Sequence, residues 1–321
     1  MLQVNYQVAI ASTIYTPNSQ SRLLNLGMNA ALSIPVHCCT IALSGAEAVN
    51  IQVKDSVTLS LGYDNQLTQV FAGKVSAVQQ SFDRITIQAV SDFQALTRAR
   101  SNLLYEQSSA ADIVKNLAQS RLGLTVSKAE TGLQFPSYAI GDHQSVYDYL
   151  HRLAQQCGFD LYANPQDQLV FAQYDPQTTH KFQYGIDILA IEQAATGAIA
   201  TGIEVYGESP ASQQGDQTTS WLSYQPVKGS AGKTATLRFV EPIARTQDAA
   251  NKIAAAYLAK HSRQRRGRVK VLGIAAVKLG DAVQLSQLPQ SDANGTFKVT
   301  GITHRLNRQR GFYTTIDWEN A

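Results

Sequence analysis

The sequence of 321 residues is poor in charged side chains, cysteine and methionine. Only 16% of the residues are charged, against about 25% in average proteins, and 32 glutamines fill part of the gap. No stretch approaches the roughly 20 apolar residues of a membrane-spanning helix, which predicts a soluble chain. The apolar fraction of 44% nevertheless excludes wholesale disorder and is typical of about two domains with their own cores.

The cysteine count and the amino terminus exclude two further classes of protein. Cys38, Cys39 and Cys157 are odd in number and lack the spacing of a metal site. We therefore expect three reduced thiols in a protein made in the cytoplasm. Residues 1–6 show neither the basic segment nor the apolar core of a secretory signal, so no export leader is predicted.

Motifs of catalysis are also missing. The sequence has no GxSxG, no HExxH, no P-loop and no dinucleotide-binding fingerprint. His143 and His151 are eight residues apart on a predicted helix and could share a face, but no third ligand lies nearby. Asp142, Asp148 and Asp160 are better explained by helix starts and turns than by paired-carboxylate chemistry. We expect no enzymatic activity, no metal and no cofactor.

Residues 1–102 are predicted to form a first antiparallel β-barrel domain. Apolar residues alternate with polar ones over 53–61 and again over 84–89, the period of a strand with one buried face. Gly62 and Gly73 interrupt strand patterns, which indicates bulges that bend a sheet toward a barrel.

Residues 103–178 are predicted to form an α+β module of helix, helix and hairpin. The first helix begins after Ser108 or Ser109 and ends at Gly123, and the second runs from about Ser145 to Cys157. Two apolar runs, 159–163 and 168–172, flank an Asn-Pro turn and indicate a β-hairpin.

Residues 179–321 are predicted to form a second β-barrel domain. Strands are expected at 186–191 and 201–207, followed by a loop insertion over 207–233 and a helix over 246–261. Asn294-Gly295 predicts a tight hairpin near the end. The fold class is therefore mainly β with an α+β insert, containing two small antiparallel barrels.

Charge is divided unequally along the chain. Residues 228–321 contain 16 Lys plus Arg against 6 Asp plus Glu, a net charge of +10, whereas residues 1–227 have a net charge of −7. This asymmetry indicates docking against other surfaces or against copies of the same chain. We define the basic run by its six cations, Lys260, Arg263, Arg265, Arg266, Arg268 and Lys270.

The basic run has three possible interpretations at this stage. It could be a solvated helix end, where cations suit the exposed carbonyl groups, or a contact with another protein subunit. It could also bind nucleic acid through phosphate neutralisation, although no aromatic residue for base stacking lies between Lys260 and Lys270. A cell-wall-active or carbohydrate-binding β protein is a further alternative for the whole chain.

The carboxy-terminal motifs add a resemblance to a known family. A Gly-Asp turn at 280–281 leads into a strand, Asn294-Gly295 opens a second strand that ends at His304, and residues 311–318 close the chain. Their order resembles the late control protein D family of contractile-tailed phages, which includes the hub part of VgrG proteins. Further agreement comes from 71–75 (F-x-G-x-V), 109–122, 135–138, 144–150 and 157–159.

The resemblance implies a structural baseplate hub without catalytic residues. Such a hub is a homotrimer in which each subunit gives two barrels to a pseudo-sixfold ring, joining a hexameric tail tube to a trimeric spike. The chain shows no spike needle after residue 318, so the resemblance implies a separate spike protein. It further implies contacts with other baseplate proteins, synthesis in the bacterial cytoplasm, incorporation into a phage virion or injection particle, and nucleic acid only as transit cargo.

Overall fold

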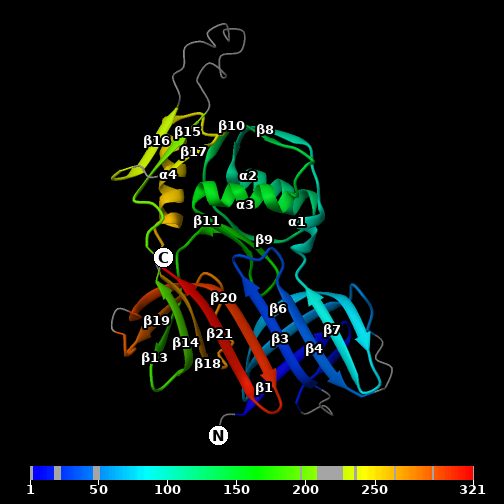
Figure 1. The fold of residues 1–321 in the computed structure, drawn as a ribbon. Coiled ribbons are helices and arrows are strands. Elements are labelled where there is room, and N and C mark those ends of the chain that lie inside the picture. The colour runs from blue at the N-terminus through cyan, green and yellow to red at the C-terminus, as the bar shows by residue number, and fades with distance from the viewer. Residues whose placement is uncertain are drawn as a thin grey trace.

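A computed structural model describes residues 3–17, 23–45, 51–195, 197–207, 227–234, 237–263, 265–290 and 293–320. These residues form a long β-sheet and, above it in Figure 1, a second body that combines helices with small sheets. Each body has its own hydrophobic cluster. The predominance of strands confirms the mainly β prediction with an α+β part.

The first half of the sheet comes from the amino-terminal third of the chain. Val57, Leu59 and Leu61 are fully buried whereas the residues between them are not, because successive side chains of a strand point to opposite faces. The strands of this half are β1 (Val4–Ile10), β2 (Thr13–Tyr15), β3 (Leu23–Ala31), β4 (Cys38–Ser44), β5 (Ser56–Tyr63), β6 (Gln66–Gln80) and β7 (Arg84–Val90).

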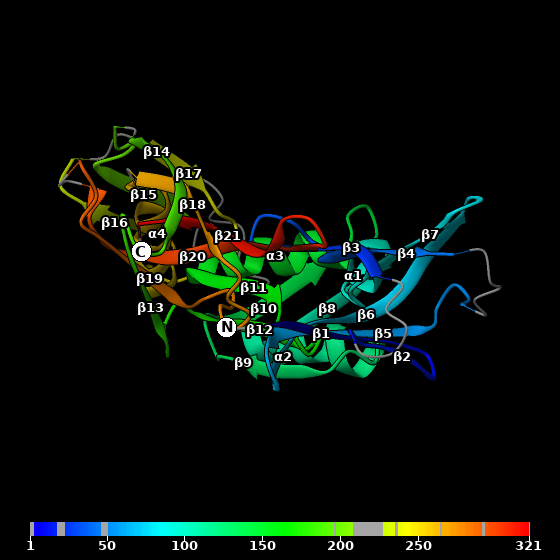
Figure 2. The ribbon, with the colours of Figure 1, turned by 90° about the horizontal axis from the view of Figure 1, so that it is seen from below.

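The second half of the sheet is built mainly from the carboxy-terminal residues. It lies beside the first half when the molecule is seen from below (Figure 2). Its strands are β13 (Thr179–Gln183), β14 (Ile188–Ala195), β18 (Arg265–Leu272), β19 (Ala282–Ser286), β20 (Gly295–Asn307) and β21 (Gly311–Glu319).

One antiparallel pairing joins the halves. Strands β20 and β3 pair from Gly301 opposite Ala31 to Asn307 opposite Asn25, and we call this pairing the seam. The strands of this sheet therefore follow one path, β14-β18-β21-β20-β3-β4-β7-β6-β5-β1-β2, with β13 and β19 beside it. Closure of either half into a barrel stays a prediction.

The second body begins with the predicted α+β module. Helix α3 starts after Ser145, whose hydroxyl accepts a hydrogen bond from the Asp148 backbone NH while the Asp148 carboxylate accepts one from the Ser145 backbone NH, and it ends at Gly158 with a positive φ. This confirms the sequence prediction. The module contains β8 (Leu103–Ser109), β9 (Val126–Ala129), β10 (Gln134–Ile140), β11 (Phe159–Ala163), β12 (Leu169–Gln173), α1 (Gln94–Arg98), α2 (Ala110–Lys115), the π-helical segment η1 (Asn116–Arg121) and α3 (Val146–Cys157).

Residues 200–207, 227–234 and 237–257 also contribute to the second body. Helix α4 (Gln247–His261), capped by Thr246, packs against α3 and against a small sheet of β15 (Gly202–Tyr206), β16 (Lys228–Gly232) and β17 (Leu237–Val240). Its buried face, including Ile253, belongs to the second hydrophobic cluster. Residues of the predicted second barrel domain thus pack with the α+β module, while the domain boundaries at 102 and 178 stay predictions.

Several local predictions are corrected by the structure. The predicted loop 207–233 contains strand β16, which pairs with β15, while residues 208–226 lie outside the described residues. The hairpin predicted at Asn294-Gly295 is confirmed by the antiparallel pairing of β19 with β20, but its connection is longer than a two-residue turn, because β19 ends at Ser286, and the Asn294 side chain accepts a hydrogen bond from the Leu288 backbone NH. The pairing of β8 with β10 was not predicted.

The longest described helix has 15 residues, and none of the described helices has the length and apolar character needed to cross a bilayer.

Candidate functional site

The face of the sheet that points away from the core is polar across the seam. Residues Leu26 and Leu306 point into the hydrophobic cluster, so their neighbours in sequence point outward. We call this outward side the polar face. Three outward pairs lie opposite one another across the seam: Asn25 with Asn307, Gly27 with Arg305, and Asn29 with Thr303.

A groove of about 400 Å³ lies on the polar face at the seam. Its floor is open at Gly27, where an added Cβ would meet no atom within 4 Å. Arg305 is exposed and is the only charged residue among the described residues that line the groove. Its other polar lining residues are Asn25, Asn29, Thr40, Thr303, Asn307 and Tyr313.

The basic run is split between a helix end and a strand. Helix α4 ends at His261, so Lys260 alone lies in the helix, and Arg265 opens strand β18. The interpretation of the run as a solvated helix end is therefore wrong beyond Lys260. Arg263 follows the helix, and the residues from Arg265 onward form strand β18, in which successive side chains point to opposite faces. Arg266, Arg268 and Lys270 share the polar face, whereas Val269 and Val271 point to the core.

Most of these cations have partners in the same chain. The Arg268 Nε donates to Asp317 Oδ1 at 2.6 Å on the neighbouring strand β21. Lys270 Nζ lies 4.1 Å from the centroid of the Tyr313 ring, close enough for a cation–π contact.

Lys260 and Arg263 border a different hollow, a cleft of about 450 Å³ between α4 and the sheet. Arg263 Nη1 donates to Glu319 Oε1 at 2.5 Å. Burial, together with the nearby Arg263 charge, lowers the pKa of Lys260. Arg265 is partly buried and Arg266 is exposed, so the structure does not gather the six predicted residues into one site.

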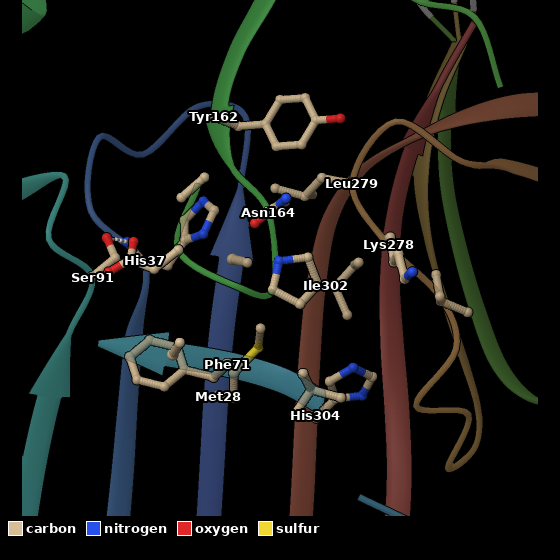
Figure 3. Close-up of a pocket in the computed structure, with 17 residues that line it drawn as sticks. Met28, His37, Phe71, Ser91, Tyr162, Asn164, Lys278, Leu279, Ile302 and His304 are labelled. Carbon is tan, nitrogen blue, oxygen red and sulfur yellow. Dashed lines mark hydrogen bonds between the residues drawn. The ribbon is translucent and has the colours of Figure 1, made fainter. Parts of the chain in front are cut away.

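A small cavity lies under the turn between β11 and β12, where the second body meets the sheet (Figure 3). Its volume of about 20 Å³ has room for about one water molecule. His37 and His304 line it, and burial lowers the pKa of each to about 4. Both imidazoles are therefore neutral at pH 7, and His304 Nδ1 lies 2.9 Å from Thr314 Oγ1.

Asp167, which also lines this cavity, anchors the turn between β11 and β12. It adopts a left-handed backbone conformation with φ of 59°, and its Oδ2 accepts a hydrogen bond of 2.6 Å from the Asp92 backbone NH. Its Oδ1 is buried and finds no partner among the described residues. Burial raises the pKa of Asp167 to about 6.

A buried ion pair also joins the second body to the sheet. Lys298 on β20 is 2% exposed, and its Nζ lies 2.6 Å from Asp160 Oδ1 on β11 and 5.0 Å from the Tyr174 ring centroid. Nearby, His180 Nε2 lies 2.9 Å from Asp281 Oδ2 and thereby links β13 to the start of β19. The Lys298–Asp160 pair thus helps to fix how the second body sits on the sheet, whereas the His180–Asp281 contact lies within the sheet.

The predicted histidine and carboxylate candidates take structural roles. His143 precedes helix α3 and contacts the Tyr149 hydroxyl, so it does not share a helical face with His151. His151 stacks on Tyr147. Among the described residues, no three His, Cys, Asp or Glu side chains are placed to hold a metal ion, and all three cysteines are free.

Sequence reasoning missed Arg305, Gly27 and Lys298. The alternation around Arg305 could have shown that it points outward, but its neighbour Gly27 lies 278 positions earlier in the chain. Lys298, between Phe297 and Val299, has the pattern of an ordinary exposed strand lysine. No local signal shows that the second body covers it.

Comparison with solved structures shows the fold of phage tail proteins. The 43 kDa tail protein of prophage MuSo2 from Shewanella oneidensis is 12% identical with a TM-score of 0.72, over 98% of each chain. The tail protein from Neisseria meningitidis MC58 is 15% identical with a TM-score of 0.71, over 99% of this chain and 96% of that one. The Escherichia coli c3393 protein, described as a component of the type VI secretion system, is 11% identical with a TM-score of 0.59, over 98% and 76%.

No curated protein matches the chain. The model of the family described as the Alg8 N-terminal domain matches residues 54–308. Because this match spans well over half of the sequence, the chain belongs to the Alg8 N-terminal domain family.

Proposed function

We propose that the protein is the structural hub of a contractile phage tail or a phage-like injection system. The observation that carries the proposal is the likeness to two tail proteins over nearly the whole length of this chain and of theirs. The sequence resemblance to late control protein D supports the same role. The proposed role is mechanical and includes neither catalysis nor a cofactor.

The proposed assembly is a homotrimeric ring with pseudo-sixfold symmetry. Each chain would supply the two halves of its sheet, which lie side by side (Figure 2), as two of six similar units. The ring would join a hexameric tube to the trimeric spike, formed by a separate protein, and contact other baseplate proteins. The particle would be a virion or injection device assembled from subunits made in the bacterial cytoplasm.

The ends of the sheet support a head-to-tail contact between subunits. Strands β14 and β2 end the path of paired strands, and each exposes an apolar side chain, Leu189 at 56% and Ile14 at 54%. Open edges of this kind invite pairing with another chain. Contacts between unlike edges generate a closed ring when the rotation fits, and the polar face would then line the channel.

The test is assembly rather than activity. Light scattering after size-exclusion chromatography is expected to give three times the chain mass of 34.9 kDa, and electron microscopy is expected to show rings that bind tube and spike proteins. Leu189→Lys and Ile14→Lys should each reduce trimer formation, whereas Val240→Lys, at a site 76% exposed on β17, should not. A strict monomer that binds neither partner would refute the proposal.

A further inference from the structure

The groove at the seam has the chemistry of a binding site rather than of an ordinary sheet surface. It combines amide and hydroxyl side chains with a single guanidinium, and convergent polar groups in a hollow are the usual mark of a ligand site. Its floor is low because Gly27 leaves open space opposite Arg305.

Arg305 is the guanidinium in the groove, and it differs from Arg263 and Arg268 in having no carboxylate partner among the described residues. Arg263 pairs with Glu319 and Arg268 with Asp317, but among the described residues no ion pair involves Arg305. A guanidinium presents donors that match a carboxylate in two parallel hydrogen bonds. The groove is therefore electrostatically complementary to an anion that the described part of the chain does not supply.

The surroundings favour a peptide over a nucleic acid as the source of that anion. Nucleic-acid binding needs several cations along the backbone and open aromatic faces for bases. The groove has one cation, and Lys270 already lies over the ring of Tyr313, the only aromatic residue among those that line it. Asn25, Asn29 and Asn307 instead offer donors and acceptors suited to an extended peptide backbone.

We propose that the groove binds an extended peptide segment of a partner protein through one carboxylate held by Arg305. The amides of the flanking asparagines bind the peptide backbone, and Gly27 leaves the depth in which the segment lies. The site is complete within one chain, so it does not depend on the ring assembly proposed above.

The chain provides its own reporter for a test. The side-chain amides of Asn25, Asn29 and Asn307 line the groove and remain in every variant used below. In protein labelled with 15N at asparagine, a blocked pentapeptide with a central aspartate should produce a saturable shift of these side-chain amide signals. The same peptide with asparagine in its centre should bind at least about tenfold more weakly, because it lacks the charge-assisted pair.

Three variants decide the assignment. Arg305→Gln should weaken binding of the aspartate peptide at least about tenfold, and Gly27→Val should block it while the protein stays folded, because the added side chain fills open space on a strand. Arg84→Gln is the matched control, since Arg84 is exposed on the same sheet outside the groove, and it should bind as the original protein does.

Several results would overturn the proposal: no saturable shift, equal binding of the asparagine peptide, or unchanged binding by Arg305→Gln. A shift produced by inorganic phosphate or by an oligothymidylate instead of the peptide would also overturn it. Light scattering on the same samples separates this inference from the proposed function, because peptide binding to a monomer would leave the groove site intact while refuting the ring.

Discussion

The seam within the sheet and the contact between the sheet and the second body join their parts by different chemistry. The seam uses main-chain pairing of β3 with β20 and leaves one side polar and open. The contact between the sheet and the second body instead depends on a buried ion pair between Lys298 and Asp160. We therefore expect substitutions on the polar face of the seam to cost little stability, because main-chain hydrogen bonds hold the two strands. Removing either member of the buried ion pair should cost much more, because the remaining charge loses its partner.

The largest expected effect is at the buried contact. Lys298→Met leaves the Asp160 carboxylate without its partner in a site where its side chain is 16% exposed, which should lower the free energy of unfolding by about 3 kcal/mol. Urea unfolding measures the change. The double variant Lys298→Met/Asp160→Leu should recover most of it, and a single variant as stable as the original protein would show that the contact does not hold the bodies together.

Two glycines on the sheet are expected to respond in opposite ways. A Cβ at Gly267 would lie 2.4 Å from the Trp318 ring, so Gly267→Ala should destabilise the protein by about 2 kcal/mol through overpacking. Gly27→Ala meets open space and should be neutral or slightly stabilising, because alanine loses less entropy on folding. Thermal unfolding measures both variants. An equal loss of stability in the two would contradict the expected difference between the core side of the sheet at Gly267 and the polar face at Gly27.

The contact should also respond to pH through Asp167. Its pKa of about 6 is above the ordinary value, so the folded state binds this proton more tightly than the unfolded state does. Its ionisation therefore disfavours folding above about pH 6, and the penalty disappears as pH falls toward 4. Asp167→Asn should raise stability by about 1 to 2 kcal/mol at pH 7.5 and change little at pH 4.

Asn suits the left-handed backbone at residue 167, so this substitution tests charge alone. Asp142→Asn, at an exposed site, provides the control and should show no such pH dependence. A loss of stability by Asp167→Asn at pH 7.5 would mean that the hydrogen bond from the Asp92 backbone outweighs the burial of the charge.

The smallest effect is expected for the ion pair on the polar face. The Arg268 and Asp317 side chains are 58% and 36% exposed, and solvent weakens such pairs. Arg268→Gln should therefore change stability by less than about 1 kcal/mol, as measured by urea unfolding at low and high salt. A loss as large as that of Lys298→Met would remove the contrast between the open face and the buried contact.

Local structure was largely predictable because its causes are local. Ser145 with Asp148, and Gly158, mark the ends of α3 in the sequence as they do in the structure. Strand β16 was missed because Gly229 and Gly232 carry no alternating apolar pattern. The hairpin at Asn294-Gly295 was predicted, but its connection is longer than the two-residue turn that this dipeptide favours.

The sequence by itself determined the mainly β class, the helix ends and the inward or outward direction of strand residues, because these depend on neighbours a few positions apart. Only the tertiary structure decided that β20 pairs with β3, that β15 to β17 and helix α4 join the second body, and that Lys298 is buried while Arg305 is open. The two cations lie on the same strand with similar local patterns. What distinguishes them is the distant segment that packs over one and leaves the other uncovered.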